Sequence, residues 1–339
     1  MSDLSLRDNR PVRILGDMRA IQITEHGGPD VLIPVETDVP EPRPGEVLVR
    51  TGAVGVNYID TYLREGVYPS ELPFVPGSEG AGVVEAVGVD APDLVVGDRV
   101  AWCQVPGSYA QYVVAPTEAL VAVPEGVDDD VAASMLLQGL TAHYLITDTH
   151  RAAEGDWVLV TAGAGGVGQL LIQLAVSRGF RVITTTSTEE KAAMCRDLGA
   201  THVLLYSEAS PDRVRELSGG GVAVVFDGVG RDTFDASLAS LARRGSLVLF
   251  GAASGPVPPV DPQRLNAAGS VFLTRPTLAD FIATTEEYRT RASEVLEGIV
   301  DGSLRLRVGA TFGLSEAAEA HRALQSRRTT GSVVLDPRR

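Results

Sequence analysis

The spacing of hydrophobic positions changes in the middle of the chain. From Met18 to about Val123, short β-rich runs are bounded by Gly and Pro, and few long helical patterns interrupt them. From about Asp128 onward, short apolar runs alternate with stretches of helical spacing. Apolar strands separated by helices are typical of a parallel sheet that is buried on both faces. The pattern predicts an α/β protein in which a β-rich domain accompanies a doubly wound parallel-sheet domain.

The second part of the pattern can be divided into individual elements. Strands are expected over residues 157–161, 181–186, 202–206, 223–227 and 246–251, and helices over residues 131–145, 167–177 and 189–198. After about Thr277 helices return, with a short strand near Leu304 and a final strand over residues 331–335.

A lone final strand needs neighbours, and the N-terminal β-rich domain is the easiest partner. We therefore expect the parallel-sheet domain to be an insertion. The expected boundaries are a flexible N-terminal extension over residues 1–17, a catalytic domain over residues 18–137 and 277–339, and an inserted domain over residues 138–276.

The strongest local motif is a glycine-rich turn between the strand ending at Thr161 and the helix that begins at Val167. Gly163 is expected to allow the tight turn, Gly165 to let a pyrophosphate approach the backbone, and Gly168 to allow close packing of helix on strand. Free N–H groups and the helix dipole at such a terminus stabilise an anion. In this strand–turn–helix context the motif predicts a dinucleotide cofactor, and a purely structural turn is the alternative.

The residues after the second strand of this domain indicate which dinucleotide binds. An NAD site usually offers Asp or Glu there, but this chain offers the hydroxyls of residues 184–187 and then Lys191. Hydroxyls and a lysine accommodate the 2′-phosphate of NADPH, which a carboxylate would repel. Arg327 or Arg328 could add positive charge. Lys191 could instead be an ordinary solvated helix lysine, and two neighbouring glutamates weaken the argument.

The composition of the chain disfavours several classes of binding partner. The formal net charge of −15 disfavours binding to nucleic acid or to anionic membranes. The two cysteines, Cys103 and Cys195, are too few for a disulfide framework or a thiolate metal cluster. Without a membrane-spanning run or a signal peptide in the sequence, we expect a cytoplasmic protein.

From Met18 onward the sequence resembles the quinone oxidoreductase (zeta-crystallin-like) branch of the medium-chain dehydrogenase/reductase superfamily. The resemblance rests on motifs that occur in the family's order, which are His26-Gly-Gly-Pro-Asp-Val-Leu, Val56-Asn-Tyr-Ile-Asp-Thr-Tyr, Pro76-Gly-Ser-Glu-Gly-Ala-Gly, Gly97-Asp-Arg-Val, Gly107-Ser-Tyr-Ala-Gln-Tyr, Gln138-Gly-Leu-Thr-Ala, Ala164-Gly-Gly-Val-Gly, Phe226-Asp-Gly-Val-Gly and Arg275-Pro. It implies a GroES-like catalytic domain, an inserted Rossmann domain that binds NADP(H), and a homodimer.

The resemblance also implies where the site residues lie. The nicotinamide and substrate pocket would be lined by Asn57, Tyr62, Tyr68 and Thr141. The cofactor would be held by Gly163, Gly165, Gly166, Val167 and Gly168 at the turn, by Thr186, Ser187, Lys191, Tyr206 and Arg327 at the 2′-phosphate end, and by Phe250, Gly251 and Ser254 in a strand-end loop. The family often has Lys where this chain has Gln138, which leaves the substrate open.

The residues that hold catalytic zinc in relatives are replaced. Zinc-dependent relatives carry Cys at the position of Asn57 and His at the position of Ser78, and a catalytic zinc needs three protein ligands. We therefore expect no metal. Without a Lewis acid, reduction favours acceptors that conjugation has already activated.

These observations predict an NADPH-dependent oxidoreductase that transfers a hydride to a quinone or another conjugated carbonyl compound. Reduction of the double bond of an enone or enoyl compound, and an NADPH-binding redox sensor without turnover, are the alternatives. Asp60 is expected to support the active-site turn by accepting backbone N–H bonds. Tyr62 or Tyr68 could donate a hydrogen bond to the substrate oxygen or could be packing aromatics.

Overall fold

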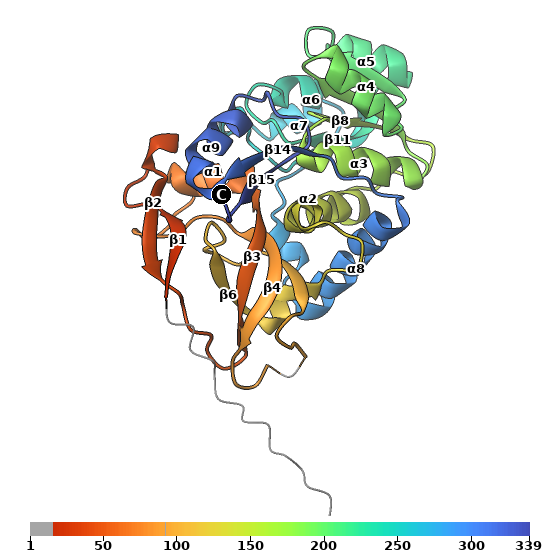
Figure 1. Ribbon diagram of the computed structural model, residues 1–339. Helices are drawn as coiled ribbons and strands as arrows, with labels where there is room; N and C mark the ends of the chain where they lie inside the picture. The colour runs from red at the N-terminus through yellow and green to blue at the C-terminus, as the bar shows by residue number, and fades with distance from the viewer. Residues whose placement is uncertain (1–15, 92) are drawn as a thin grey trace, which may run out of the picture. The chain divides into compact units, whose positions relative to one another are not determined.

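The computed structural model describes residues 16–91 and 93–339, which divide into two compact units (Figure 1). Unit 1 contains the described residues up to Ser134 together with Thr311–Leu324 and Val333–Arg339, and unit 2 contains Met135–Ala310 and Gln325–Ser332. The division gives residues 277–310 to unit 2, whereas the sequence-based boundaries gave them to the catalytic domain; those boundaries stay a prediction. Of the expected N-terminal extension, residues 1–15 lie outside the described residues, and Asp17 is the first residue of a strand.

Unit 2 contains a six-stranded sheet in which every strand pair is parallel. Its strand order is β10-β9-β8-β11-β12-β13, so β8 and β11 are neighbours in the middle of the sheet and the chain winds outward from them in both directions. This is the doubly wound Rossmann arrangement, in which ligands bind at the carboxyl ends of the strands where the order reverses. The strands are β8 Trp157–Val160, β9 Arg181–Thr186, β10 His202–Leu205, β11 Val222–Asp227, β12 Leu241–Leu249 and β13 Phe272–Thr274.

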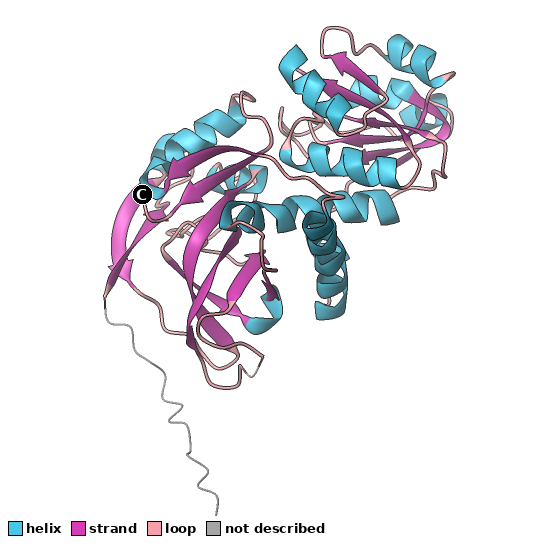
Figure 2. Ribbon diagram, turned by 45° about the vertical axis from the view of Figure 1, so that its right-hand side comes forward, coloured by secondary structure: helices cyan, strands magenta, loops and turns pink. Residues whose placement is uncertain are grey.

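Helices separate these strands along the chain, and Figure 2 shows them flanking the parallel sheet. A buried cluster that includes Ile183, Val225 and Leu247 forms the apolar core of the sheet. The unit 2 helices are α3 Gly166–Ser177, α4 Glu189–Asp197, α5 Pro211–Ser218, α6 Phe234–Ser240, α7 Gln263–Ala267 and α8 Thr285–Asp301, while α2 Asp129–Asp148 begins in unit 1 and ends in unit 2. The doubly wound fold predicted from the alternating pattern is confirmed.

Unit 1 is built on a mostly antiparallel sheet with the order β14-β15-β3-β4-β5-β7, in which β6 also pairs with β3. Its strands are β3 Glu46–Val56, β4 Glu79–Val87, β5 Arg99–Cys103, β6 Tyr112–Pro116, β7 Leu120–Ala122, β14 Val308–Gly313 and β15 Ser332–Asp336, and a separate pair is formed by β1 Asp17–Gln22 and β2 Ile33–Asp38. Helices α1 Tyr58–Arg64 and α9 Ala317–Gln325 accompany the sheet.

The final strand has the partner that the sequence predicted. β15 runs antiparallel to β3, with Val333 opposite Val56, so the end of the chain completes the N-terminal sheet. The strand expected near Leu304 is wrong, because β14 begins only at Val308. Leu304 instead closes the C-terminus of α8: Gly302 has φ 78°, and the Leu304 N–H donates to the Gly298 carbonyl at 2.8 Å. The buried Leu304 side chain packs on Gly298, as an apolar residue following a left-handed helix cap commonly does.

Within the described residues, no helix combines the length and the apolar character needed to cross a lipid bilayer.

Candidate functional site

Two glycines of the turn before α3 are required by packing within unit 2. A Cβ atom at Gly163 would lie 2.1 Å from Thr184 Oγ1 on β9, and a Cβ atom at Gly168 would lie 2.5 Å from the Ala162 carbonyl oxygen. The close helix–strand packing predicted for Gly168 is therefore present. Within the turn the left-handed residue is Ala162, with φ 53°, while Gly163, which was expected to allow the tight turn, leaves the room that the close approach of β9 requires.

Gly165 has a different environment. A Cβ atom there would meet only the Ala162 carbonyl oxygen, at 3.2 Å, so packing within the protein leaves this side of the turn open. Gly165 is the N-cap of α3, it provides no side-chain cap, and the first turn of α3 carries no acidic residue. Gly165, Gly166 and Val167 are all partly exposed. Uncapped N–H groups beside an open backbone suit a bound pyrophosphate, so the turn fits a dinucleotide.

Gln138 of α2 lies against this turn. A Cβ atom at Gly166 would lie 2.2 Å from Gln138 Oε1, and the same oxygen accepts a hydrogen bond from Ser332 Oγ at 2.7 Å. Gly331 N donates to the Ala164 carbonyl oxygen at 2.9 Å. The backbone before β15 is therefore attached to the glycine turn, and the first side chain of β15 is attached to α2.

The residues after β9 include a distinctive cation. Lys191 is the only lysine among the 339 residues. Its N–H donates to Thr188 Oγ1, the N-cap of α4, and its Nζ donates to the Arg327 carbonyl oxygen at 2.7 Å. Burial lowers the pKa of Lys191. The nearby Glu189 is drawn into an ion pair with Arg196 at 2.5 Å, which weakens its effect on a bound phosphate.

The other residues expected at the 2′-phosphate end lie around Lys191. Arg327 has φ 57°, and its guanidinium lies 3.5 Å from the Ala253 carbonyl oxygen. The Tyr206 N–H donates to the Thr186 carbonyl oxygen at 2.9 Å, and the Tyr206 side chain is 42% exposed. Thr186 is buried and Ser187 is exposed. The structure thus brings this predicted group together at the carboxyl end of the neighbouring strands β9 and β10.

The strand-end loop with Phe250, Gly251 and Ser254 rests on the loop that follows β11. The Phe250 N–H donates to the Asp227 carbonyl oxygen at 2.9 Å, and a Cβ atom at Gly251 would lie 2.4 Å from the Gly228 carbonyl oxygen. Ser254 is buried, and its hydroxyl donates to the Val229 carbonyl oxygen at 2.8 Å. This hydroxyl therefore ties two loops of unit 2 together.

Asp227, which the sequence reasoning did not assign, organises these loops. Its fully buried carboxylate accepts from the N–H groups of Val229 and Gly230 at 2.9 and 3.1 Å, from Thr233 Oγ1 at 2.8 Å and from Ser237 Oγ at 2.7 Å. A buried carboxylate needs such donors. The motif Phe226-Asp-Gly-Val-Gly contained the signal, because an acid at the end of an apolar strand and before two glycines has backbone N–H groups within reach.

The expected pocket residues are divided between the two units. Asn57, Tyr62 and Tyr68 belong to unit 1, and Thr141 lies buried on α2 in unit 2. In unit 1 the rings of Tyr62 and Tyr68 meet edge to face with centroids 5.6 Å apart, and Tyr68 is 39% exposed. Asn57 is buried at the N-cap of α1, and its Nδ2 donates to Glu79 Oε2 at 2.7 Å.

Asp60 accepts a backbone N–H bond, as the sequence suggested. Its fully buried carboxylate accepts from the Asn57 N–H at 2.8 Å, while the Asp60 N–H donates to the Asn57 carbonyl oxygen at 3.1 Å. Tyr109 Oη donates to the same carboxylate at 3.1 Å. Burial raises the pKa of Asp60 to about 7, against the lowering effect of these two hydrogen bonds.

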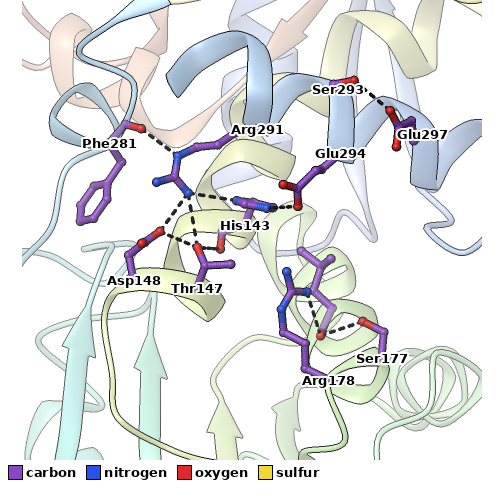
Figure 3. A network of polar contacts seen from close by, with 11 residues as sticks. His143, Thr147, Asp148, Ser177, Arg178, Phe281, Arg291, Ser293, Glu294 and Glu297 are labelled. Carbon is purple, nitrogen blue, oxygen red and sulfur yellow. Dashed lines mark hydrogen bonds and ion pairs between the residues drawn. The ribbon is translucent and has the colours of Figure 1, made fainter. Parts of the chain in front are cut away.

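A polar network fixes the second half of α2, which also carries Thr141 (Figure 3). Arg291 of α8 donates to Asp148 Oδ2 at 2.9 Å, to His143 Nδ1 at 3.0 Å and, through Nε, to the Phe281 carbonyl oxygen at 2.9 Å. His143 Nε2 then donates to Glu294 Oε2 at 2.7 Å, a direction that follows because Arg291 can only donate. His143 therefore links α2 to α8 through both of its ring nitrogens.

The side chains at the position of the relatives' zinc ligands do not form a ligand set. Asn57 uses its amide N–H to bind Glu79, and Ser78 offers a hydroxyl where relatives offer an imidazole. Across residues 16–91 and 93–339, no three His, Cys, Asp or Glu side chains gather in a way that could hold a metal ion. The absence of a metal from the functional protein stays a prediction.

Known proteins are similar to this chain in both of its units. Residues 43–125 match the family model described as alcohol dehydrogenase GroES-like domain, and residues 166–297 match the one described as zinc-binding dehydrogenase. A quinone oxidoreductase of Pseudomonas aeruginosa is 45% identical over 94% of this chain and 99% of its own. A 2-haloacrylate reductase of a Burkholderia species is 42% identical over 94% and 98%.

A solved mycobacterial structure in complex with NADPH is also similar. It superimposes with a TM-score of 0.91 at 56% identity, covering 94% of this chain and 100% of that one. Similarity of this extent over both units, together with the two family models in the expected order, agrees with the strand order and the glycine turn described above. The chain belongs to the quinone oxidoreductase branch of the medium-chain dehydrogenase/reductase superfamily.

Proposed function

We propose that this protein transfers a hydride from NADPH to a quinone or another conjugated carbonyl compound without a catalytic metal. The observation that carries the proposal is the cationic corner after β9, where the only lysine of the chain contacts the backbone of Arg327. The mycobacterial relative bound to NADPH and the quinone oxidoreductase of Pseudomonas aeruginosa support the proposal. We further propose that the protein is a cytoplasmic homodimer that acts on a small molecule.

Within unit 2, the residues of the chain hold the cofactor by its charged groups. The N–H groups around Gly165 bind the pyrophosphate, while Lys191, Arg327 and the exposed Ser187 bind the 2′-phosphate. Phe250 and Gly251 form the loop beside the cofactor, which Asp227 keeps in place. When bound, NADPH supplies the hydride.

Within unit 1, the side chains suit an acceptor that is already electron-poor. Asn57 and Glu79 bind each other, so this pair does not supply a set of free anionic ligands for a Lewis-acidic metal. Stabilisation of the developing oxyanion must then come from hydrogen bonds, and the hydroxyl of Tyr62 or Tyr68 is the proposed donor. Conjugation in the acceptor lowers the activation free energy of hydride transfer, so hydrogen bonds have to stabilise the transition state by a smaller amount.

Reduction of a conjugated carbon–carbon double bond is the second candidate. It is favoured by the 42% identity to a 2-haloacrylate reductase over almost the whole chain. In both reactions a hydride from NADPH adds to one atom of a conjugated carbonyl system and a proton completes the product, leaving NADP⁺, so the same pocket residues serve either. A steady-state screen of NADPH with 1,4-benzoquinone, 9,10-phenanthrenequinone and trans-2-enals separates them. NADPH binding without turnover of any of these acceptors would instead indicate a redox sensor.

The single lysine allows a direct test of the cofactor site. Reductive methylation with ¹³C-formaldehyde keeps the positive charge of an amine and labels only Lys191 and the N-terminal amine. We expect NADP⁺ to shift the Lys191 signal in a saturable way and NAD⁺ at the same concentration to leave it nearly unchanged. The N-terminal signal is the internal control. Equal shifts with both dinucleotides would remove the 2′-phosphate role of Lys191.

Kinetics of the Lys191→Ala variant give an independent test. A charge-assisted hydrogen bond contributes about 1.5–3 kcal/mol, so the variant should raise the KM for NADPH about tenfold or more and leave the KM for NADH nearly unchanged. Arg213→Ala on the exposed face of α5 is the matched control, because Arg213 pairs only locally with Glu216. An equal rise of both KM values in Lys191→Ala would contradict the preference for NADPH.

A further inference from the structure

A chain of buried hydrogen bonds in unit 1 ends on the backbone of Asn57. Arg64 Nη1 contacts His321 Nδ1 at 2.8 Å, His321 Nε2 contacts Tyr109 Oη at 2.9 Å, and Tyr109 Oη contacts Asp60 Oδ2 at 3.1 Å. The same Asp60 oxygen accepts the Asn57 N–H at 2.8 Å. The four side chains that form this series of hydrogen bonds are fully buried. They come from α1, from the segment before β6 and from α9, and the labels of α1 and α9 lie together in Figure 1.

The guanidinium of Arg64 fixes the direction of this chain. An arginine can only donate, so His321 Nδ1 must accept and His321 Nε2 must carry the hydrogen of a neutral ring. His321 Nε2 therefore donates to Tyr109 Oη, which leaves the Tyr109 hydroxyl hydrogen for Asp60 Oδ2. Burial and the charge of Arg64 lower the pKa of His321 to about 3, so the ring stays neutral at physiological pH. The opposite direction would place an N–H group of His321 against an N–H group of Arg64.

Arg64 is itself held in place. Its Nε donates to the Gly27 carbonyl oxygen at 3.0 Å, and it forms an ion pair with Glu65. At Tyr109, the ring lies over Gly77, where a Cβ atom would be 2.2 Å from Tyr109 Cδ1. The aromatic ring thus occupies a space that only glycine leaves open, which brings its hydroxyl between Asp60 and His321.

Burying these polar side chains costs more free energy than a helix cap requires. Asp60 Oδ1 is buried and has no hydrogen-bond partner among the residues that the structure describes. Exposed Ser or Asp caps supply the same N-terminal hydrogen bond without burying a carboxylate. What the buried chain adds is a fixed backbone at Asn57, whose side chain is at the same time held by Glu79 at 2.7 Å. A buried polar network with a single direction specifies one conformation rather than adding much stability.

We propose that His321, Tyr109 and Asp60 are positioning residues that hold Asn57 in the orientation in which it lines the acceptor pocket. The inference rests on the proposed function, because Asn57 is a pocket residue only under that proposal. It assigns a role in the reaction to α9, a helix near the end of the chain that carries no residue of the proposed site except through this chain of hydrogen bonds.

Tyr109→Phe is the first test, because phenylalanine keeps the ring over Gly77 and removes only the hydroxyl that links His321 to Asp60. We expect kcat/KM for the acceptor to fall about tenfold or more, since small displacements of pocket groups have large effects on rate. The Kd for NADPH, measured by fluorescence, should change less than about twofold, because the cofactor residues of unit 2 are untouched.

Tyr58→Phe is the matched control. The Tyr58 hydroxyl donates to the Leu324 carbonyl oxygen at 3.0 Å, so it also links α1 to α9 but does not pass through Asp60. If attachment of α9 to α1 were all that mattered, both variants would lose activity equally, and that result would overturn the inference. Unchanged kcat and KM in Tyr109→Phe would overturn it as well and would leave the proposed function standing.

His321 provides a rescue experiment. Glutamine carries one acceptor and one donor group and can reproduce the direction of the chain, whereas leucine cannot. We expect His321→Gln to retain most of the activity and His321→Leu to lose it. Equal activity of the two variants would contradict the positioning role. If His321→Leu does not fold, the comparison of Tyr109→Phe with Tyr58→Phe decides the matter alone.

Hydrogen–deuterium exchange separates this inference from the proposed function. In Tyr109→Phe, the peptide that contains the Asn57 amide should exchange faster than in the wild-type protein, and unchanged exchange would overturn the inference. This readout needs no substrate. If the wild-type protein turned over none of the acceptors, the proposed function would fail, and the exchange result would still decide whether the buried chain holds Asn57.

Discussion

At the scale of single residues, the glycines of the turn before α3 differ in what surrounds them. Thr184 and the Ala162 carbonyl oxygen exclude a side chain at Gly163 and Gly168, whereas Gly165 meets only one oxygen at 3.2 Å. The first two therefore serve the fold. Gly165 has φ −80°, which any residue adopts, and a Cβ atom there would make one tight contact, with a backbone oxygen, so packing explains its missing side chain less fully than at the other two glycines.

Gly165→Val separates these two roles. We expect the variant to unfold at nearly the same urea concentration as the wild-type protein and to lose at least about tenfold in NADPH affinity, about 1.4 kcal/mol, because the side chain would occupy the pyrophosphate position. Isothermal titration calorimetry measures the loss. Gly28→Val, where a Cβ atom has nothing within 4 Å and φ is −68°, is the control for adding a valine side chain to a glycine. Retained affinity in Gly165→Val would contradict the dinucleotide site.

Asp60 gives a pH-dependent prediction. Its pKa is about 7 in the folded protein, against the ordinary 3.8 of an aspartate, so the folded state binds more protons between these values. The carboxyl group therefore favours folding below about pH 4, and this contribution is lost as the pH rises through 7. Asp60→Asn does not titrate. We expect its free energy of unfolding, relative to wild type, to rise by about 2–3 kcal/mol between pH 5 and pH 8.

Urea denaturation of both proteins at the two pH values measures this difference. The size of the difference at pH 5 reflects the exchange of an oxygen for an NH₂ group, so only the change of the difference between pH 5 and pH 8 tests the prediction. A difference that stays flat or shrinks with rising pH would show that the carboxyl group is not raised in pKa. The comparison within each pH removes the contributions of all other titrating groups.

Residue-scale chemistry was only partly predictable from the sequence. The backbone-accepting role suggested for Asp60 was visible because Asn57 lies three positions away, within reach of one helical turn. The hydrogen bonds of His321 could not be predicted from the sequence. Its partner Arg64 lies 257 positions earlier, and no local pattern reports such a contact. Asp227 lies between these cases, because its donors are close in sequence but its burial depends on the whole sheet.

At the scale of elements, helix α2 is held by contacts at both ends of its second half. Gln138 abuts the glycine turn, and Asp148 and His143 bind Arg291 of α8 (Figure 3). Burial alone would raise the pKa of Asp148, but the hydrogen bonds from Thr147 and Arg291 outweigh it and lower the pKa. The network thus keeps Asp148 ionised and attached to α8.

Arg291→Lys tests this attachment. Lysine retains the charge but cannot reach Asp148, His143 and the Phe281 carbonyl oxygen together, since it lacks the planar fork of the guanidinium. We expect a loss of about 1–3 kcal/mol in the free energy of unfolding, because the His143 ring and the Phe281 carbonyl oxygen lose a donor. Arg213→Lys, in an exposed pair with Glu216, should change stability by less than about 0.5 kcal/mol. Equal effects of both substitutions would show that the network adds nothing to stability.

Element boundaries followed the hydrophobic pattern where the elements are regular. The predicted strand over 181–186 coincides with β9, and the predicted helix over 189–198 differs from α4 by one residue. The strand expected near Leu304 was wrong because a buried leucine after a glycine also fits a helix cap. In isolation, an apolar residue flanked by polar ones does not distinguish these structures.

At the scale of the whole molecule, the chain returns to its first sheet after completing the second. β15 pairs with β3, Gly331 just before it is bound to the glycine turn, and Ser332 at its start is bound to Gln138 of α2. The fold class was predictable because alternating elements determine a doubly wound sheet. The domain boundaries were harder to predict from the sequence, since α2 and β14 each run across the division between the units.

Cofactor binding should be visible in the thermal stability of the whole protein. A ligand at about 100 times its Kd adds about 2.7 kcal/mol to the folded state that binds it. For a unit of this size, this corresponds to a rise in Tm of roughly 5–10 °C. We expect NADPH to produce such a rise in differential scanning calorimetry and NADH at the same concentration to produce a smaller one. Identical shifts would argue against recognition of the 2′-phosphate at Lys191.

The contact between Lys191 and the backbone of Arg327 has a practical consequence for anyone who immobilises this protein. Amine coupling to a sensor chip can proceed only at the start of the chain or at Lys191, since no other lysine exists. Under the proposed function, molecules tethered at Lys191 would have their NADPH site against the matrix and would not bind the cofactor. A surface prepared in this way would understate the binding capacity, whereas saturation with NADPH during coupling would direct attachment to the other amine.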